Sequence, residues 1–132
     1  MTDIVIQGIG GRMGHVLCDM IAQREDCRVI AGIDLKDGNQ NGIPVYDSLK
    51  KLDGKGDVII DFSSPAAVEK ALPYCEAHKL PIVVCTTRAF RKSCSSRWCS
   101  YPARCRCSRA LICPWASTCC RSCASALRLF WV

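Results

Sequence analysis

The stretch Asp3-Ile-Val-Ile-Gln-Gly-Ile-Gly-Gly-Arg-Met-Gly14 decides the fold of this chain. An apolar run ends in a glycine-rich turn, which is typical of a buried parallel strand followed by a helix. Glycines at positions 8, 11 and 14 permit a tight turn, let a pyrophosphate approach the backbone and let the helix pack closely on the strand. The N-terminus of the helix would offer free N–H groups to the phosphates. The stretch therefore predicts a nucleotide-binding turn.

The helix after this turn is predicted to run from Gly11 to about Gln23. Arg12 lies in its first turn, where a cation opposes the helix dipole. This placement favours an anionic ligand beside Arg12, and the alternative is a solvated arginine on a glycine-rich turn. The helical spacing predicts one apolar face, formed by Met13, Val16, Leu17, Met20 and Ile21.

Strands and helices alternate through the rest of residues 1–87. We predict strands at 27–33, 57–61 and 80–85, a short helix at 47–52 capped by Asp47 or Ser48, and a helix at 65–78 that Pro73 can bend. Residues 36–44 are dense in Gly and Asn and are predicted to be a loop. The alternation predicts an α/β fold, a Rossmann-like doubly wound parallel sheet.

Two charged residues follow the second predicted strand. Asp34 lies twenty residues after Gly14, where dinucleotide-binding folds place an acid that accepts hydrogen bonds from the adenosine ribose. The alternative is a capping or turn aspartate. Lys36 could pair with a 2′-phosphate or be a solvated loop charge. Asp34 therefore favours NADH, and Lys36 leaves NADPH open.

The remaining strand ends are the other candidates for a ligand crevice, because ligands of such sheets bind outside the carboxyl ends of the strands. Phe62-Ser63-Ser64-Pro65 follows the third strand and Cys85-Thr86-Thr87 follows the fourth. Composition alone would make both ordinary loop segments. His15 and His78 lie on predicted helices, and we interpret them as solvated rather than catalytic.

These motifs together resemble the dihydrodipicolinate reductase family of bacterial lysine and diaminopimelate biosynthesis. Gly8…Gly11-Arg-Met-Gly14 is similar to the family's Gly-x-x-Gly-Arg-Met-Gly, Val58-Ile-Ile-Asp-Phe-Ser-Ser-Pro65 to its Ile-Asp-Phe-Thr/Ser-x-Pro, and Val84-Cys-Thr-Thr87 to its Gly-Thr-Thr-Gly loop. Cys85 stands where glycine is usual and could crowd the nicotinamide loop. Arg88 stands where the last glycine belongs, and the resemblance stops there.

The resemblance implies a cytoplasmic, homotetrameric reductase that transfers a hydride from NADH or NADPH to 4-hydroxy-tetrahydrodipicolinate. It also implies that the substrate-binding and tetramerising half lies beyond this chain, so we expect no catalytic residue here and little or no turnover. We expect no metal, nucleic-acid or membrane partner. The candidate cofactor-binding residues are Gly8, Ile9, Gly10, Gly11, Arg12, Met13, Asp34, Lys36, Phe62, Cys85, Thr86 and Thr87.

Composition changes sharply between Thr87 and Arg88. The whole chain has twelve cysteines and a net charge of +6, which would indicate a secreted disulfide scaffold or a basic nucleic-acid binder. Residues 1–87 carry a net charge of −3 with four cysteines, whereas residues 88–132 carry +9, no acid and eight cysteines. We therefore predict a partial dinucleotide-binding domain over 1–87 and a poorly structured, Cys/Arg/Ser-rich tail over 88–132.

The tail is best interpreted as a shifted reading frame. Every Cys codon begins with TG. If each codon instead starts at the third base of one residue and ends with the first two bases of the next, every codon that reaches into a cysteine ends in TG and encodes Leu, Val or Met. The eight cysteines then become ordinary core residues. Arg88-Ala89 read in the same way gives NGC, which can encode the missing glycine. The alternative is a non-catalytic NAD(P)-binding module whose tail binds metal or nucleic acid, although the cysteine spacing fits no zinc ribbon. A different dehydrogenase with the same nucleotide fold also remains open.

Overall fold

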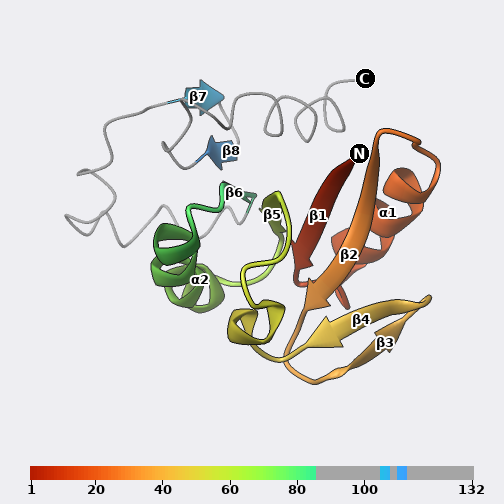
Figure 1. The fold of residues 1–132 in the computed structure, drawn as a ribbon, viewed down its shortest axis with the longest axis horizontal. Helices are drawn as coiled ribbons and strands as arrows, with labels where there is room; N and C mark the ends of the chain where they lie inside the picture. Colours follow the sequence, from red (N-terminus) through yellow and green to blue (C-terminus); the bar gives the residue numbers. More distant parts are fainter. Residues whose placement is uncertain (86–104, 108–109, 113–132) are drawn as a thin grey trace.

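The computed structural model describes residues 1–85 and the backbone of two short strands further along, β7 (Cys105–Cys107) and β8 (Ala110–Ile112) (Figure 1). The candidates Thr86 and Thr87 lie outside the described residues. The predictions made for the tail at 88–132 also lie outside them, apart from those two strands.

One sheet runs through the structure, in the order β3-β4-β2-β1-β5-β6-β8-β7. Strands β4, β2, β1, β5 and β6 are parallel, whereas β3 pairs antiparallel with β4 and β8 antiparallel with β6. The Rossmann-like fold is thus confirmed, but the sheet is mixed and not wholly parallel. The described elements up to residue 85 are β1 (Thr2–Gln7), α1 (Arg12–Ala22), β2 (Cys27–Ile33), β3 (Gly38–Gln40), β4 (Ile43–Tyr46), the 3₁₀ helix η1 (Leu49–Leu52), β5 (Val58–Asp61), α2 (Pro65–His78) and β6 (Ile82–Val84).

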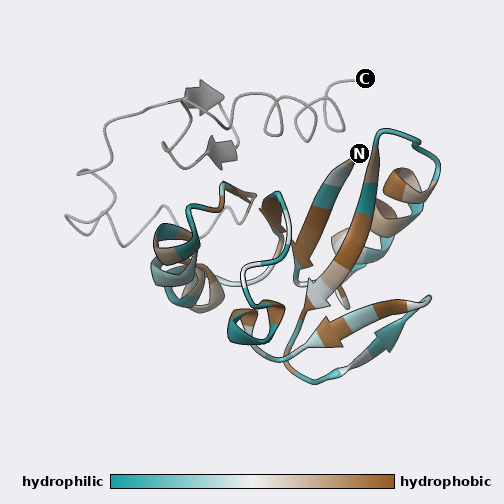
Figure 2. Cartoon of the chain, viewed as in Figure 1, coloured by the Kyte–Doolittle hydropathy of each residue, from teal (hydrophilic) through white to brown (hydrophobic). Residues whose placement is uncertain are grey.

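Neighbouring residues of a strand point to opposite sides of the sheet, so the apolar strands present two apolar faces, and a helix covers each of them. Ile4 and Ile6 of β1 share a buried cluster with Leu17 of α1, whereas Val5 shares one with Val68 of α2. The hydrophobic segments of β1, β2 and β5 in Figure 2 form the centre of this arrangement. The doubly wound interpretation is therefore confirmed.

The strand order reverses between β1 and β5. From β1 the chain builds outward through β2 to β4, and it then returns to add β5 and β6 on the other side of β1 (Figure 1). Such a reversal leaves a crevice outside the carboxyl ends of the two central strands, where open α/β sheets bind their ligands. This edge of the sheet is where the candidate site residues are to be sought.

The loop predicted over residues 36–44 is wrong, because most of it forms a hairpin of β3 and β4. Asn41 and Gly42 join the two strands with backbone φ of 53° and 83°, the pair of positive values that a two-residue type I′ turn requires. The Gly42 N–H also donates to Asn39 Oδ1 at 2.9 Å. An Asn-Gly pair is itself a hairpin signal, but the surrounding Gly and Asn obscured it.

The predicted apolar face of α1 is only partly correct. Its buried residues are Gly14, Leu17, Cys18 and Ile21. Met13, Val16 and Met20 are instead 46%, 47% and 42% exposed. The buried face begins at Gly14, whose lack of a side chain lets the helix approach the preceding turn closely.

Both helix starts lie close to the predicted positions. Ser64 Oγ accepts from the Ala67 N–H at 3.4 Å, and Pro65 takes the first helical position of α2. Ser48, and not Asp47, caps the short helix at Leu49–Leu52, which is 3₁₀. Within residues 1–85 and the two tail strands, no helix is long and apolar enough to cross a bilayer.

Candidate functional site

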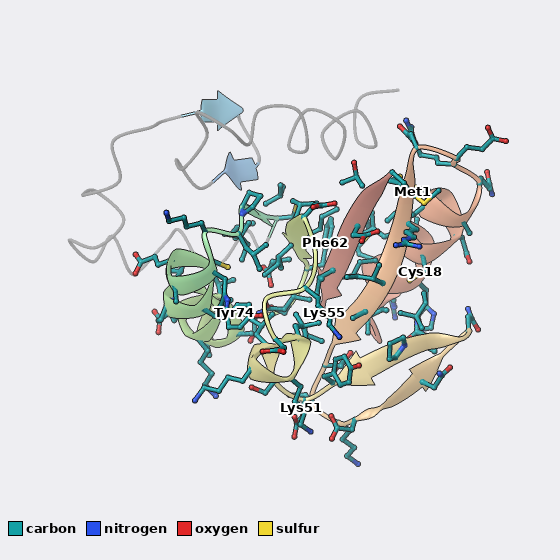
Figure 3. All side chains as sticks on the ribbon, in the orientation of Figure 1. Met1, Cys18, Lys51, Lys55, Phe62 and Tyr74 are labelled. Atoms are coloured by element: carbon teal, nitrogen blue, oxygen red, sulfur yellow. The ribbon has the colours of Figure 1, made fainter. Side chains whose placement is uncertain are left out.

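The glycine turn brings three strand ends together. Gly8 has a φ of +84° and donates its N–H to the Ile33 carbonyl oxygen of β2 at 2.7 Å. A Cβ at Gly8 would lie only 2.8 Å from the Phe62 carbonyl oxygen, just after β5. Phe62 is labelled in Figure 3, next to β1 and β5. Glycine is therefore required at position 8 by both its backbone conformation and its neighbour.

The N-terminus of α1 opens onto this turn without a side-chain cap. Gly11 is the N-cap residue, no side-chain hydrogen bond caps this end within the part of the chain that the structure describes, and the first turn contains no acid. Arg12 and Met13 are exposed beside it. The first backbone N–H groups of a helix need partners, and with the helix dipole they favour an anion such as a phosphate.

Two backbone N–H groups bind the carboxylate of Asp34, and one of them belongs to the glycine turn. Its Oδ2 accepts from the Gly10 N–H at 2.7 Å, and its Oδ1 accepts from the Leu35 N–H at 2.7 Å. A Cβ at Gly10 would lie 2.5 Å from Oδ2, so glycine permits this contact. Each carboxylate oxygen has lone pairs for a further donor, such as a ribose hydroxyl.

An open cleft of about 360 Å³ extends from Asp34 to the β3–β4 hairpin. The exposed side chain of Leu35 and the candidate Lys36 lie on its rim, and Lys36 follows Asp34 by two residues. Sequence reasoning missed the far wall of the cleft because it took the hairpin for a loop. The lining residues are Gly10, Asp34, Leu35, Lys36, Gly38, Asn39, Gln40 and Val45.

Gln40 fastens the hairpin to the glycine turn. Its Nε2 donates to the Ile9 carbonyl oxygen at 3.2 Å and lies 3.1 Å from His15 Nδ1. His15 is thus exposed but has a polar neighbour, and His78 likewise lies against Tyr74, with 4.3 Å between ring centroids. The candidate Ile9 has a fully buried side chain, so only its main chain can face a ligand.

A second polar cluster lies at the carboxyl ends of β1 and β5. Gln7 and Asp61 are paired in the register of the two strands and are 3% and 0% exposed. Gln7 Nε2 donates to Ser63 Oγ at 3.4 Å, and the Ser63 hydroxyl in turn donates to Asp61 Oδ1. Ser63 belongs to the segment at 62–65 that the sequence marks as a candidate for the crevice. Gln7 and Asp61 were not candidates, although a polar residue that ends an apolar strand is a signal that could have found Gln7.

Cys85 joins the site through the end of β6. Its N–H donates to the Asp61 carbonyl oxygen at 3.0 Å. Burial raises the pKa of the Cys85 thiol to about 11, and the negative charge of Asp61 adds to the rise. The thiol is therefore neutral at physiological pH and acts as a small apolar side chain here.

We expect Cys85 to be alkylated by iodoacetamide about a hundredfold more slowly than an ordinary cysteine at pH 8, because only the thiolate reacts. The rate should rise with pH up to about 11. Because the unfolded thiol ionises first, the free energy of unfolding should fall as pH rises from about 9 towards that value. Peptide mass spectrometry measures the labelling, with the chain in guanidinium as the control. Equal rates in the native and unfolded chain would contradict the assignment.

The site offers backbone donors and carboxylates. Among the residues that the structure describes, no group of three His, Cys, Asp or Glu side chains is placed to hold an ion. Of the candidates from sequence, the structure brings the turn residues 8–13 together with Asp34, Lys36 and Phe62, and links Cys85 to them through Asp61.

Comparisons with known proteins place this geometry in context. The family model described as the N-terminus of dihydrodipicolinate reductase matches residues 2–95. The 4-hydroxy-tetrahydrodipicolinate reductases of Clostridium novyi (strain NT) and Clostridium tetani (strain Massachusetts / E88) are 32% and 31% identical to the chain over 87 residues, which cover 66% of this chain and 34% of each relative. The chain thus spans about a third of the length of these curated relatives.

Solved structures give the same assignment of the fold. A dipicolinate-bound dihydrodipicolinate reductase from Paenisporosarcina sp. TG-14 aligns with a TM-score of 0.59 and 25% identity, covering 66% of this chain and 38% of that one. A UDP-D-quinovosamine 4-dehydrogenase from Vibrio fischeri aligns with a TM-score of 0.53 and 19% identity, covering 63% of this chain and 76% of that one. The second likeness concerns the fold alone.

Proposed function

Because residues 2–95 match its N-terminal domain, the chain belongs to the dihydrodipicolinate reductase family, and from this premise we propose that residues 8–13, Asp34, Lys36, Phe62 and Cys85 hold a nicotinamide dinucleotide. The contact that carries the proposal is the one between Asp34 Oδ2 and the Gly10 N–H, at 2.7 Å. It brings the Asp34 carboxylate close to the uncapped N-terminus of α1, which supports a site where the carboxylate binds ribose hydroxyls and the helix N-terminus binds phosphates.

The residues present fit such a cofactor. A Cβ at Gly14 would lie 2.6 Å from the Gly8 carbonyl oxygen, so the close turn that a pyrophosphate needs depends on glycine there. Arg12 adds a positive charge at the same end of α1. Asp34 and the hairpin would hold the adenosine half, and Phe62, Cys85 and the candidate Thr86 and Thr87 would face the nicotinamide half. The bound cofactor supplies a hydride; the protein binds and orients it.

We further propose that this domain serves the reduction of 4-hydroxy-tetrahydrodipicolinate in lysine and diaminopimelate biosynthesis. The names of the curated relatives support this substrate. The family's homotetramer is likewise a proposal for this chain.

Titration of the whole 132-residue chain with NADH, followed by nicotinamide fluorescence, tests cofactor binding. We expect saturable binding in the micromolar range that is usual for such ligands. An NADPH titration then compares the two cofactors, and displacement of NADH by ADP-ribose measures the affinity that does not depend on the nicotinamide ring. A chain that is folded by circular dichroism and binds none of the three would refute the proposal.

We also propose that the domain boundary lies between Thr87 and Arg88 and that the residues after it come from a shifted reading frame. The change in charge and cysteine content supports this boundary. The family model extends somewhat further, to residue 95. Sequencing the gene across codons 85–90 tests the frame, and an intact frame with the tail confirmed by mass spectrometry would refute it.

A further inference from the structure

The buried side chain of Gln7 has a desolvation cost that the fold does not explain. It is 3% exposed at the end of an otherwise apolar strand, and within the described residues its Oε1 has no hydrogen-bond partner. A buried acceptor without a partner loses its hydration and gains nothing in return. A leucine of similar size would fill the same space without this penalty. The carboxamide therefore serves something other than stability.

The amide nitrogen of Gln7 begins a series of hydrogen bonds that runs through Ser63 to Asp61. Nε2 donates to Ser63 Oγ at 3.4 Å, and Ser63 donates its hydroxyl to Asp61 and its N–H to Asp61 Oδ1 at 3.3 Å. Because the Ser63 hydroxyl proton is directed to Asp61, Ser63 can only accept from Gln7, which fixes the orientation of the amide. The three residues form one directional chain from β1 to the segment after β5.

The position of these hydrogen bonds in the sheet indicates which half of the cofactor they affect. Gln7 and Asp61 are register partners at the strand reversal, on the side of Val5 and Ile59 that faces α2. The cleft beside Asp34 lies on the other side of β1, over β2 and the hairpin. A dinucleotide bound across the reversal would therefore place its nicotinamide half over β5, next to Phe62 and Ser63.

We propose that Gln7 is a positioning residue for the nicotinamide half of the cofactor and that it acts through Ser63 and Asp61. By fixing the Ser63 hydroxyl it holds the segment after β5, whose backbone is already tied to β1 by the hydrogen bond from the Phe62 N–H to the Gln7 carbonyl oxygen at 2.9 Å. This inference rests on the proposed cofactor binding and adds to it a residue that determines affinity for one half of the ligand.

The test compares NADH with ADP-ribose, which lacks only the nicotinamide ring, on the whole chain. Gln7→Leu should weaken NADH binding about fivefold, the usual value of one neutral hydrogen bond, and leave ADP-ribose binding within about twofold. Ser63→Ala should have the same effect, and the double variant should be no weaker than the weaker single variant, because both residues act in one chain. Gln40→Leu is the matched control, because it should weaken both ligands alike.

Stability provides the second measurement. Gln7→Leu should leave the melting temperature unchanged or raise it, because the variant removes the unpartnered oxygen and Ser63 keeps Asp61 as its partner. A purely structural role would instead lower it. The inference is overturned if Gln7→Leu weakens both ligands equally, leaves NADH binding unchanged, or if the two single effects multiply. A wild-type chain that binds neither ligand refutes the proposed function and this inference with it.

Discussion

Gly14→Ala should disrupt the packing of α1 on the glycine turn and remove most of the cofactor affinity. The new Cβ would lie 2.6 Å from the Gly8 carbonyl oxygen and closer still to that of Ile9. Both atoms belong to the backbone, so no flexible side chain can move aside. Overpacking of this kind costs about 1–3 kcal/mol of unfolding free energy.

The loss of affinity follows from the same displacement. The turn would have to move away from the helix, and the N–H groups that we propose bind the phosphates would move with it. Because a misplacement of about 1 Å can cost a hundredfold in a preorganised site, we expect NADH binding to weaken by more than about tenfold.

Denaturant unfolding followed by circular dichroism, together with NADH titration, measures both effects of Gly14→Ala. Gly38→Ala is the control for stability, because a Cβ at Gly38 would meet no atom within 4 Å. It changes the same residue type in the same way on an exposed strand. A Gly14→Ala chain as stable as the wild type, with the same affinity for NADH, would show that the turn tolerates the side chain.

The features that the sequence predicted best are those encoded within a few neighbouring residues. The glycine turn, the strand at Cys27–Ile33 and the helix that begins at Pro65 each depend on local spacing and capping, and the structure has them where expected. The hairpin was missed although Asn41-Gly42 encodes it locally, because the strands on either side are only three and four residues long. Short strands give a weak periodic signal.

The contacts that complete the site depend on residues far apart in the chain. Gln7 and Ser63 are separated by 56 positions, and Gln40 and Ile9 by 31. Spacing arguments cannot pair such residues, because the register of β1 with β5 and the closure of the hairpin determine which side chains come into contact. The exposed Met13, Val16 and Met20 show the same limit, since helical spacing defines a face but not the side that becomes buried.

Asp34→Ala should weaken NADH binding by about ten- to a hundredfold, because hydrogen bonds to a charged group contribute about 1.5–3 kcal/mol. The carboxylate now accepts from the Gly10 and Leu35 N–H groups at 2.7 Å, so its removal also frees the turn at Gly10. NADPH should lose less affinity than NADH, because the variant removes a negative charge that repels the 2′-phosphate while Lys36 remains on the same rim of the cleft.

Asp34→Asn separates these two contributions. The amide oxygen can still accept from the Gly10 N–H, so the turn should stay in place, whereas the charge is gone. If the charge of Asp34 sets the preference between the cofactors, Asp34→Asn should shift the ratio of NADPH to NADH affinity as Asp34→Ala does. Adding Lys36→Ala to either Asp34 variant should then shift the ratio back towards NADH. Asp19→Ala, an equal change of charge at an exposed position of α1, should leave both affinities within about twofold. Equal losses for NADH and NADPH in Asp34→Ala would mean that the carboxylate only holds the turn and does not select the cofactor.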